Sequence, residues 1–260
     1  MITPTQIENL SKFFQIDRYT IFREYLQLLF LSYLYQDKKS AKIYFKGGTA
    51  IHLLFGSPRF SEDLDFASLY QRKELKTIIR NVENKMGKEL FGIKISLLSQ
   101  GKKSIRFRLK YTFMDFKYPF AIRLDFQEKE RPKQIITSSL VTNFPLIFFP
   151  IINHLSGEEI LTEKIIALLL RSKGRDFFDL WFLLEKGIKI PKQLLKLKFR
   201  QKKLKFSKEI LIKKIANFPF KKLQSDLNKF LPQPQRKVIK ILKSTLVHKL
   251  SKIINKAVLF

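Results

Sequence analysis

The sequence FKGGTAIHLLFGSPRFSEDLDF occupies residues 45–66, and its glycine pair separates two kinds of apolar segment. Residues 43–45 are apolar and aromatic, which predicts a short strand that ends at the turn Gly47-Gly48-Thr49. Residues 50–55 continue as an apolar helical turn. The backbone N–H groups of such a glycine turn, together with the threonine hydroxyl, are suited to hold an anionic group.

A second short strand follows this turn and carries Asp63 and Asp65. Residues two apart on a strand lie on the same face, so both carboxylates are expected on one side, with Leu64 and Phe66 facing a core. Two neighbouring ionised carboxylates repel each other unless a cation lies between them. Because oxygen ligands suit magnesium, the pair predicts a Mg²⁺ site beside the anion-binding turn. Metal and phosphate binding together indicate nucleotide chemistry.

The combined pattern resembles the AbiEii/AbiGii-type nucleotidyltransferase toxins, a branch of the polymerase-β-like superfamily. The residues that carry the resemblance are Gly47-Gly48-Thr49 followed by Arg59-x-Ser61-x-Asp63-Leu64-Asp65-Phe66. The resemblance implies an α+β fold, in which a nucleotidyltransferase core with a mixed sheet and flanking helices precedes a basic helical domain. It also implies a nucleoside triphosphate (NTP) substrate, with Arg59 and Ser61 joining the glycine turn in nucleotide binding.

A third metal-binding carboxylate is expected from the strands that follow. Residues 104–113 and 120–126 predict a hairpin closed near residues 115–119. Asp125 lies on the face opposite the apolar row of the second strand, so it is the best-placed partner for Asp63 and Asp65. Alternatively, Asp125 lies on a solvated strand face and has no metal role. Asp115 is the rival candidate for the third ligand, but it falls near a turn, where aspartate is common for structural reasons.

A helix is predicted from the capping-box pattern Ser156-x-x-Glu159 to about Ser172. Lys164 shares a face of this helix with apolar residues, so its position is not explained by solvation alone. Such a lysine suits the charge of a departing pyrophosphate, but it is equally suited to an ion pair or to extending its amine toward solvent.

The next segment, Arg175 to Gly187, predicts a short helix with glycine just past its end. Asp176 is placed to cap that helix, and it shares a face with Asp179. The toxin family has a lysine and an aspartate in its later motifs, and both are implicated in activity. The resemblance therefore implies roles for Lys164 and Asp176, with Arg175 and Asp179 as further candidates.

The predicted organisation has three parts: an N-terminal helical cap (1–40), a nucleotidyltransferase core (41–155), and a C-terminal helical domain (156–260). Periodicity predicts helices over 5–37 and 71–90 and a strand over 93–98, whereas 131–153, with three prolines, predicts an irregular strand and connector. The last domain is divided into catalytic helices (156–187) and a basic tail (188–260), with amphipathic helices over 191–216, 220–230 and 235–256.

Charge is the second strong signal. The chain has 51 Lys and Arg against 22 Asp and Glu, a net charge of +29, and residues 186–260 hold 22 basic residues against two acidic ones. Such a surplus favours a polyanionic partner, because neutralised phosphates release counterions. A solvated lysine-rich surface or an acidic protein partner is the alternative. A membrane surface is disfavoured, because the basic helices follow a catalytic core and adjoin no apolar anchor.

Composition narrows the setting. The absence of cysteine excludes disulfides and thiolate zinc sites. The sequence shows no signal peptide and no apolar run of membrane-spanning length, so a cytoplasmic protein is expected, monomeric by default. His52, His154 and His248 match no ligand or triad spacing, and the glycine turn lacks the Gly-Lys-Ser/Thr ending of a P-loop.

The resemblance, with which the basic charge agrees, implies a toxin–antitoxin type nucleotidyltransferase. It would transfer nucleoside monophosphate from an NTP to RNA, at the 3′ end of tRNA, with two Mg²⁺ ions and a cognate antitoxin as partner. One alternative keeps the site but changes the acceptor to a protein or small-molecule hydroxyl. Another, from a different class, is a non-catalytic RNA-binding module with a relict site.

Overall fold

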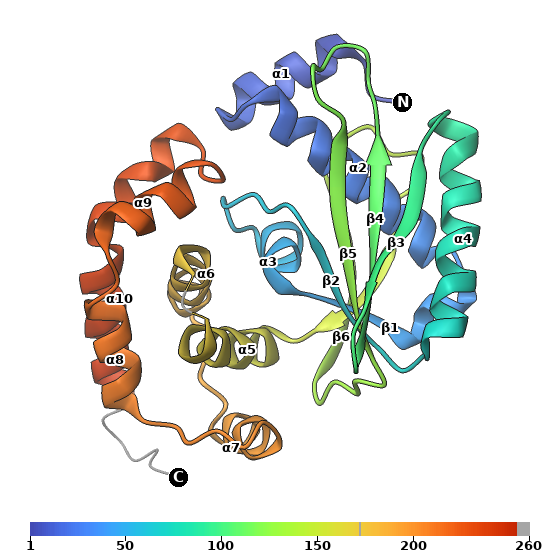
Figure 1. Ribbon diagram of the computed structural model, residues 1–260. Coiled ribbons are helices and arrows are strands. Elements are labelled where there is room, and N and C mark those ends of the chain that lie inside the picture. The colour runs from blue at the N-terminus through green and yellow to red at the C-terminus, as the bar shows by residue number, and fades with distance from the viewer. Residues whose placement is uncertain (172, 254–260) are drawn as a thin grey trace. The chain divides into compact units, whose positions relative to one another are not determined.

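The computed structural model describes residues 1–171 and 173–253, and the chain forms two compact units (Figure 1). The sheet unit comprises residues 1–56 and 60–155, so the N-terminal helices belong to the same unit as the strands. The helical unit comprises residues 57–59 and the chain from Ser156 onward. The three residues 57–59 therefore belong to the helical unit, although they lie between two elements of the sheet unit in sequence.

The sheet is mixed and has seven strands in the order β3-β4-β5-β2-β1-β7-β6. β2 pairs with β5, and β1 with β7, in parallel, whereas the other neighbours are antiparallel. The predicted α+β fold with a mixed sheet is thereby confirmed. The strands are β1 (Ile43–Lys46), β2 (Leu64–Ser68), β3 (Lys94–Gln100), β4 (Ser104–Tyr111), β5 (Phe120–Glu128), β6 (Ile135–Ser139) and β7 (Ile151–Leu155).

Two expectations about the strands need correction. Strand β2 begins at Leu64, so Asp63 lies immediately before the strand and not inside it. The segment 131–153 is more regular than predicted, because it contains β6 and the start of β7, and β7 lies between β1 and β6. The prolines of this segment fall outside the two strands, where their missing N–H groups interrupt no ladder hydrogen bond.

Four helices accompany the sheet: α1 (Pro4–Phe14), α2 (Arg18–Tyr35), α3 (Gly47–Phe55) and α4 (Arg72–Glu89). Asp17 caps α2 by accepting a hydrogen bond from the Thr20 N–H. On α2 the ring of Phe22 is fully buried and lies 4.8 Å from that of Phe120 on β5. Helices α2 and α4 contact each other, and in the view of Figure 1 α2 passes behind strands β3 to β5 while α4 lies to their right. One face of these strands is thus packed against helices.

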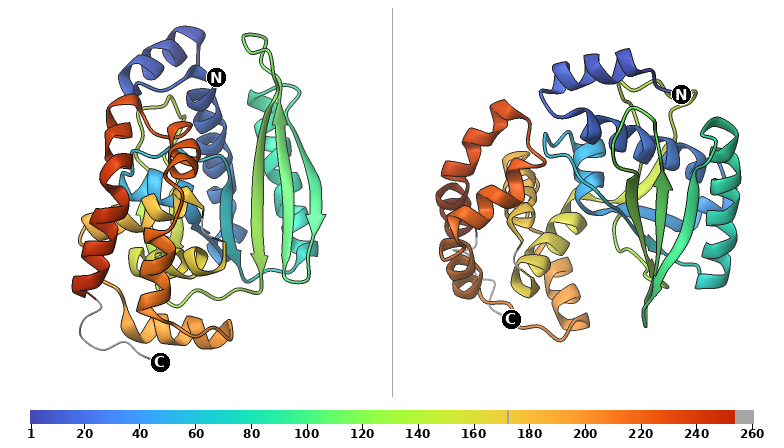
Figure 2. Two further views of the ribbon diagram at one scale, coloured as in Figure 1. Left: turned by 60° about the vertical axis from the view of Figure 1, so that its left-hand side comes forward. Right: turned by 45° about the horizontal axis from the view of Figure 1, so that its top comes forward.

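The helical unit contains six α-helices in its described part, and Figure 2 shows them from two further directions. They are α5 (Gly157–Leu170), α6 (Gly174–Glu185), α7 (Lys192–Gln201), α8 (Lys208–Ala216), α9 (Phe220–Asn228) and α10 (Ile239–Ile253), with a 3₁₀ turn over Gln233–Val238. Among the described residues, no helix of either unit is long and apolar enough to cross a membrane.

The single helix predicted over 191–216 is wrong, because the segment forms α7 and α8. The chain reverses at Lys203, whose φ of 53° is left-handed, and the Leu204 N–H donates to the Phe199 carbonyl. The buried Phe206 ring then packs 5.4 Å from the Phe199 ring. The predicted end of the last helix, Lys256, and the predicted end of the 156–172 helix, Ser172, lie outside the described residues.

Candidate active site

The predicted site residues fall into two groups, one in each unit. The sheet unit holds the glycine turn, Ser61 and the three metal-binding candidates, and the helical unit holds Arg59, Lys164, Arg175 and Asp176.

Gly47 and Gly48 are the first two residues of helix α3, so the expected turn is a direct passage from strand to helix. Gly47 has a φ of +82°, and a Cβ added there would meet the carboxylate of Asp65. The Lys46 side chain at the cap position pairs with Glu130 at 2.8 Å. The first N–H groups of a helix have no intrahelical acceptor, so they and the helix dipole favour an anion at this end.

Thr49 and Ser61 are placed by hydrogen bonds inside the sheet unit. The buried Thr49 hydroxyl donates to the backbone carbonyl of Asp63. This bond ties helix α3 to the residue that precedes β2. The backbone carbonyl of Ser61 accepts a hydrogen bond from the Gln27 side chain at 3.1 Å. Both residues therefore fix the approach to Asp63, and the Thr49 hydroxyl is already engaged in this contact.

The structure places Asp125 beside Asp65. Strands β2 and β5 run parallel, and Asp65 and Asp125 occupy directly paired positions. Paired residues on neighbouring strands lie on the same face. Asp63, two residues before Asp65, ion-pairs with Arg123, which is two residues before Asp125. The rival candidate Asp115 is exposed in the loop between β4 and β5.

Arginines contact the candidate metal-binding carboxylates. The Arg106 guanidinium donates to Asp125 Oδ2 at 2.6 Å, while Gln127 donates to Asp125 Oδ1 at 3.1 Å. Arg123 donates to Asp63. Both arginine side chains are exposed, at 39% and 44%, so solvent reaches them. The negative charge of the carboxylates is thus balanced by cations on flexible side chains.

Whether these residues could hold a divalent metal ion is judged from their donor atoms. Among residues 1–171 and 173–253, no three His, Cys, Asp or Glu side chains are gathered so that they could hold a metal ion. Asp65 and Asp125, from paired positions of β2 and β5, and Asp63, just before β2, nevertheless supply the hard oxygen donors that Mg²⁺ prefers. Binding would require Arg106 and Arg123 to leave the carboxylates. The metal role of the three residues stays a prediction.

In the helical unit, Arg59 forms a bidentate ion pair with Asp179. Its Nε and Nη2 donate to the two carboxylate oxygens at 2.7 and 3.0 Å, and both side chains are 1% exposed. Arg59 was expected to contact a nucleotide phosphate, but its guanidinium is committed to this buried pair. Fork-to-fork pairing of this kind fixes orientation as well as charge. It anchors the segment 57–59 to helix α6.

Lys164 on α5 belongs to the same buried cluster. Its amine lies 2.7 Å from Asp179 Oδ2 and 3.1 Å from Asp176 Oδ1. Burial alone would lower the pKa of Lys164, but the charges of Asp179 and Asp176 outweigh it, and the pKa is raised. Lys164 is therefore a permanent cation held by two carboxylates. Lys164 thus forms the ion pairs that the sequence analysis gave as an alternative to phosphate binding. Its catalytic role stays a prediction.

Asp176 is fully buried and also accepts two hydrogen bonds from Arg171, at 2.9 and 3.0 Å. Burial would raise the pKa of this carboxyl, but Lys164 and Arg171 together lower it to about 2. Asp176 was expected to cap α6, but Lys173 occupies the N-cap position and Asp176 lies in the first turn, where it pairs with Lys164. Its role in activity stays a prediction. Arg175 is half-buried on the first turn of α6.

Sequence reasoning missed the arginines that contact the carboxylates. The signal was present, because the alternation that placed Asp125 on the polar face of its strand also places Arg123 there. The same alternation in residues 104–111 puts Arg106 and Arg108 on one face. The contact of Arg171 with Asp176 depends on how the end of α5 lies against the start of α6, which no local pattern shows.

Two of the three histidines, His52 and His154, have structural partners. His52 Nε2 lies 2.7 Å from Glu24 Oε2, and its ring packs 4.5 Å from that of Phe60. His154 is buried between the Ser138 hydroxyl and the Leu155 carbonyl, at 2.9 and 2.8 Å. Burial lowers the pKa of His154.

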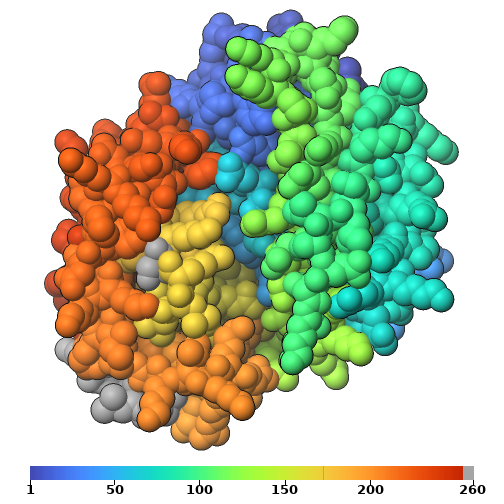
Figure 3. Space-filling view, in the orientation of Figure 1, coloured from blue at the N-terminus to red at the C-terminus, as the bar shows by residue number. Residues whose placement is uncertain are grey.

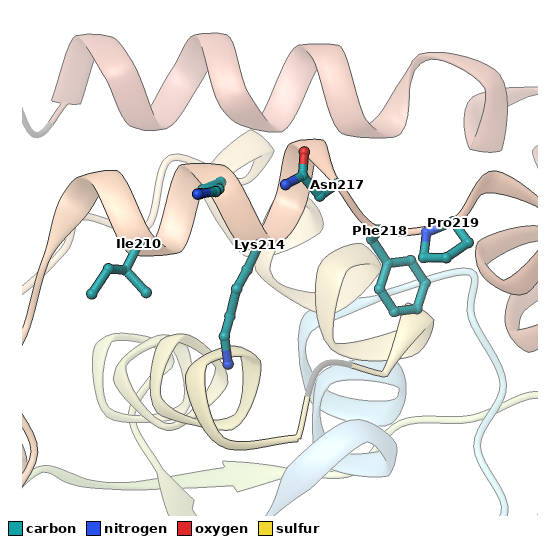
Figure 4. Close-up of a pocket in the computed structure, with 6 residues that line it drawn as sticks. Ile210, Lys214, Asn217, Phe218 and Pro219 are labelled. Carbon is teal, nitrogen blue, oxygen red and sulfur yellow. The ribbon is translucent and has the colours of Figure 1, made fainter.

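An open pocket of about 410 Å³ lies in the helical unit, apart from the predicted residues. Its lining comes from α8 and the residues that follow it: Ile210, Lys213, Lys214, Asn217, Phe218 and Pro219 (Figure 4). The Lys214 amine donates to the backbone carbonyl of Leu169 at the end of α5. This contact holds α8 against α5, so Lys214 has a packing role.

Solved structures identify the fold as that of nucleotidyltransferases. MenT4, a nucleotidyltransferase toxin of Mycobacterium tuberculosis, is similar with a TM-score of 0.59 and 15% identity, over 99% of this chain and 91% of that one. JHP933 of Helicobacter pylori is similar with a TM-score of 0.52 and 20% identity, over 91% of this chain and 95% of that one.

Sequence comparison extends this from fold to family. The family model described as "Nucleotidyl transferase AbiEii toxin, Type IV TA system" matches residues 29–246, and the chain belongs to this family of toxin–antitoxin nucleotidyltransferases. An uncharacterized protein of Aquifex aeolicus is 27% identical over 181 residues, 67% of this chain and 73% of that protein. The predicted family and enzyme class are confirmed, and membership implies an antitoxin partner.

Proposed function

We propose that this nucleotidyltransferase transfers a nucleoside monophosphate from an NTP to a hydroxyl of an RNA acceptor, at the 3′ end of tRNA, with two Mg²⁺ ions. The observation that carries the proposal is the direct pairing of Asp65 with Asp125 on parallel strands, with Asp63 two residues away. Two paired strands and the residue before one of them thus supply the carboxylates, and Asp65 lies against Gly47, the first residue of α3.

The reaction makes one bond to phosphorus and breaks another. The acceptor oxygen bonds to the α-phosphorus, and the bond from that phosphorus to the oxygen bridging the β-phosphate breaks. Pyrophosphate leaves with the bonding electrons, and the hydroxyl proton passes to solvent. Because no covalent enzyme intermediate is needed, the protein acts by positioning and charge stabilisation.

The residues of the sheet unit bind and orient the nucleotide. The free N–H groups of the first turn of α3, at Gly47 and Gly48, bind phosphate oxygens. Thr49 holds the Asp63 backbone and so fixes the carboxylates relative to that helix. When bound to Asp63, Asp65 and Asp125, Mg²⁺ would neutralise developing charge and lower the pKa of the acceptor hydroxyl.

The helical unit contributes positive charge. Lys164 is kept protonated by Asp176 and Asp179 and so carries a full charge suited to a triphosphate. Arg175 is a second candidate for the same role. Contact between the Lys164 amine and a phosphate would replace one of its two present ion pairs.

An RNA acceptor is favoured by charge. The net charge of +29 suits a polynucleotide, whereas a small hydroxylated acceptor needs no such surplus. Membership of a toxin family also supports an RNA acceptor. A toxin that modifies tRNA would arrest growth, because all protein synthesis depends on tRNA.

Labelled-nucleotide transfer tests the proposal. The purified protein is incubated with total tRNA, Mg²⁺ and each of the four labelled NTPs, and label in RNA is measured. Asp63→Ala should reduce transfer to below about one hundredth of the wild-type rate, because a metal ligand is lost. Asp115→Ala, which alters an exposed loop carboxylate, is the matched control and should transfer normally.

The outcomes separate the candidate functions. Transfer by wild type that Asp63→Ala leaves intact would refute the site assignment. Label found on protein or a small hydroxylated molecule, but not on RNA, would replace the acceptor. No nucleotide binding by calorimetry in the presence of Mg²⁺ would indicate a non-catalytic RNA-binding module.

A further inference from the structure

One face of strands β3, β4 and β5 carries a continuous group of cations. On β4, Arg106, Arg108 and Lys110 alternate with the buried residues that face helices α2 and α4. Arg108 pairs directly with Arg123 on β5, and Lys110 pairs directly with Lys94 on β3. Because directly paired residues share a face, the five side chains lie together, and we call them the basic sheet face.

The basic sheet face is continuous with the candidate carboxylates. Arg106 is directly paired with Asp125 and bonded to it, and Arg123 is bonded to Asp63. From these contacts the cations continue along β4 to Lys110, about 13 Å from Arg106 at the rise of a strand. Figure 3 shows the side of strands β3 to β5 that α2 and α4 leave open to solvent. The cations therefore form an accessible row that begins at the carboxylates.

Like charges in this row are placed against each other. Arg108 lies opposite Arg123, and Lys110 lies opposite Lys94. Directly opposed like charges on neighbouring strands destabilise a sheet, so this arrangement costs stability. Asp63 offsets the charge of Arg123, but in the described part of the chain Arg108, Lys110 and Lys94 have no acidic partner. A bound polyanion would remove the repulsion.

We propose that the basic sheet face binds the phosphodiester backbone of the RNA acceptor and leads its reactive end to Asp63, Asp65 and Asp125. This inference rests on the proposed function for the identity of the acceptor. A row of about 13 Å is longer than a triphosphate, so it suits successive phosphates of a strand better than a single nucleotide. Phosphate contacts of this kind position a nucleic acid without reading its sequence.

The inference also gives Arg106 and Arg123 a second state. In the absence of ligands they neutralise the carboxylates, and their exposed side chains are free to swing toward phosphate oxygens when a metal ion takes their place. Arginine forms bidentate bonds with carboxylate and with phosphate alike, so the exchange preserves the geometry of its contacts.

The test uses the full chain and two matched double variants. Arg108→Ala/Lys110→Ala removes two charges from the basic sheet face at positions that do not touch the carboxylates. Lys76→Ala/Arg80→Ala removes the same two charges from exposed positions on α4. Binding of a labelled single-stranded RNA and of total tRNA is measured by fluorescence anisotropy over a range of salt concentrations. Circular dichroism melting confirms that both variants are folded.

The sheet-face variant should bind RNA about tenfold more weakly at physiological salt, and the control variant should bind like wild type. The dependence of log K on log salt should become shallower by about 1.4, since each lost single-strand phosphate contact contributes about 0.7. Nucleotide affinity, measured by calorimetry, should be unchanged, because the row serves the acceptor and not the NTP.

Equal loss in both variants, or unchanged RNA affinity in the sheet-face variant, would overturn the inference. Unchanged RNA affinity with lost binding of polyglutamate would instead assign the face to an acidic protein. The proposed function fails separately: if wild type transfers no nucleotide to any RNA while the sheet-face variant alone loses RNA affinity, the face is a binding surface and the chemistry is wrong.

Discussion

Gly47 illustrates how a single residue can serve both fold and site. Its φ of +82° lies in the left-handed region, where any Cβ is strained. A Cβ would also press against the Asp65 side chain. The glycine therefore permits the start of α3 to approach a candidate metal ligand at close range. Both requirements arise at the same position, where strand β1 turns directly into the helix.

Comparison of three glycines tests this explanation. Gly92 has nearly the same φ, +84°, but open space around it, and Gly87 lies in α4 with open space and no left-handed backbone. Gly92→Ala should cost about 1–2 kcal/mol from strain alone, whereas Gly47→Ala should cost about 1–3 kcal/mol more and abolish transfer. Gly87→Ala should stabilise by about 0.5–1 kcal/mol.

Urea unfolding of the three variants and a transfer assay provide the measurements. If Gly47→Ala and Gly92→Ala have equal unfolding free energies and Gly47→Ala keeps its activity, the close approach to Asp65 has no consequence and the account is incorrect.

At the scale of elements, helices α5 and α6 are joined by buried charges. Lys164 on α5 meets Asp176 and Asp179 on α6, and Arg171 between the helices adds two bonds to Asp176. Removing one partner from a buried group of charges costs far more than the group contributes as a whole, because an unpaired charge remains. The relative placement of the two helices is therefore sensitive to each member.

The pH dependence of stability follows from Asp176. Its pKa in the folded state is about 2, below the ordinary value of 3.8. A depressed carboxyl pKa contributes stability that is present above the unfolded value and lost as pH falls toward the folded value. Unfolding free energy should therefore decline by about 2 kcal/mol between about pH 4 and pH 2 on account of this residue.

Arg171→Ala tests the assignment, because it removes two of the bonds that lower this pKa. We expect it to cost about 1–2 kcal/mol at pH 7 and much less at pH 2, where Asp176 is partly protonated. Lys173→Ala, an exposed neighbour, serves as the control. Urea unfolding is measured at both pH values, and an equal cost of Arg171→Ala at pH 7 and pH 2 would contradict the role given to Asp176.

The elements also show what local sequence reasoning can reach. Strand alternation correctly placed Asp125 on the polar face of its strand. That Asp65 lies beside it depends on the parallel pairing of β2 with β5, which cannot be seen in the local sequence. The Ser156 hydroxyl accepts the Glu159 N–H as predicted, yet the Glu159 carboxylate pairs with Lys198 on α7 at 2.7 Å. In both cases the contact partner comes from a distant part of the sequence.

Other failures have equally specific causes. The break between α7 and α8 was missed because Lys203, and not a glycine, takes the left-handed conformation that ends α7. The segment 131–153 was predicted as one irregular strand and connector because it contains three prolines, but all three lie outside β6 and β7, so both strands are regular. The bidentate pair of Arg59 with the buried Asp179 could not be predicted either, because the two residues are 120 positions apart in sequence, while the nucleotide-binding role of Arg59 stays a prediction.

At the scale of the whole molecule, the large positive charge makes the stability of the folded protein depend on bound anionic ligands. A chain with a net charge of +29 repels itself, and bound polyanions or nucleotides relieve that repulsion. Any ligand that binds only the folded state also stabilises it by mass action. Ligand-induced stabilisation therefore reports whether the carboxylates work as a metal-dependent nucleotide site.

A thermal shift experiment makes this prediction quantitative. With Mg²⁺ and an NTP at 100 times its dissociation constant, the protein should be stabilised by about 2.7 kcal/mol. EDTA should remove most of the shift produced by the NTP, because the phosphates then meet Asp63, Asp65 and Asp125 without a cation between them. Asp63→Asn should lose the magnesium-dependent part while melting like wild type without ligand, since its partner Arg123 is exposed. A shift of equal size in EDTA, or in Asp63→Asn with Mg²⁺, would mean that the NTP binds by its charge to the basic surface and that the three carboxylates hold no metal.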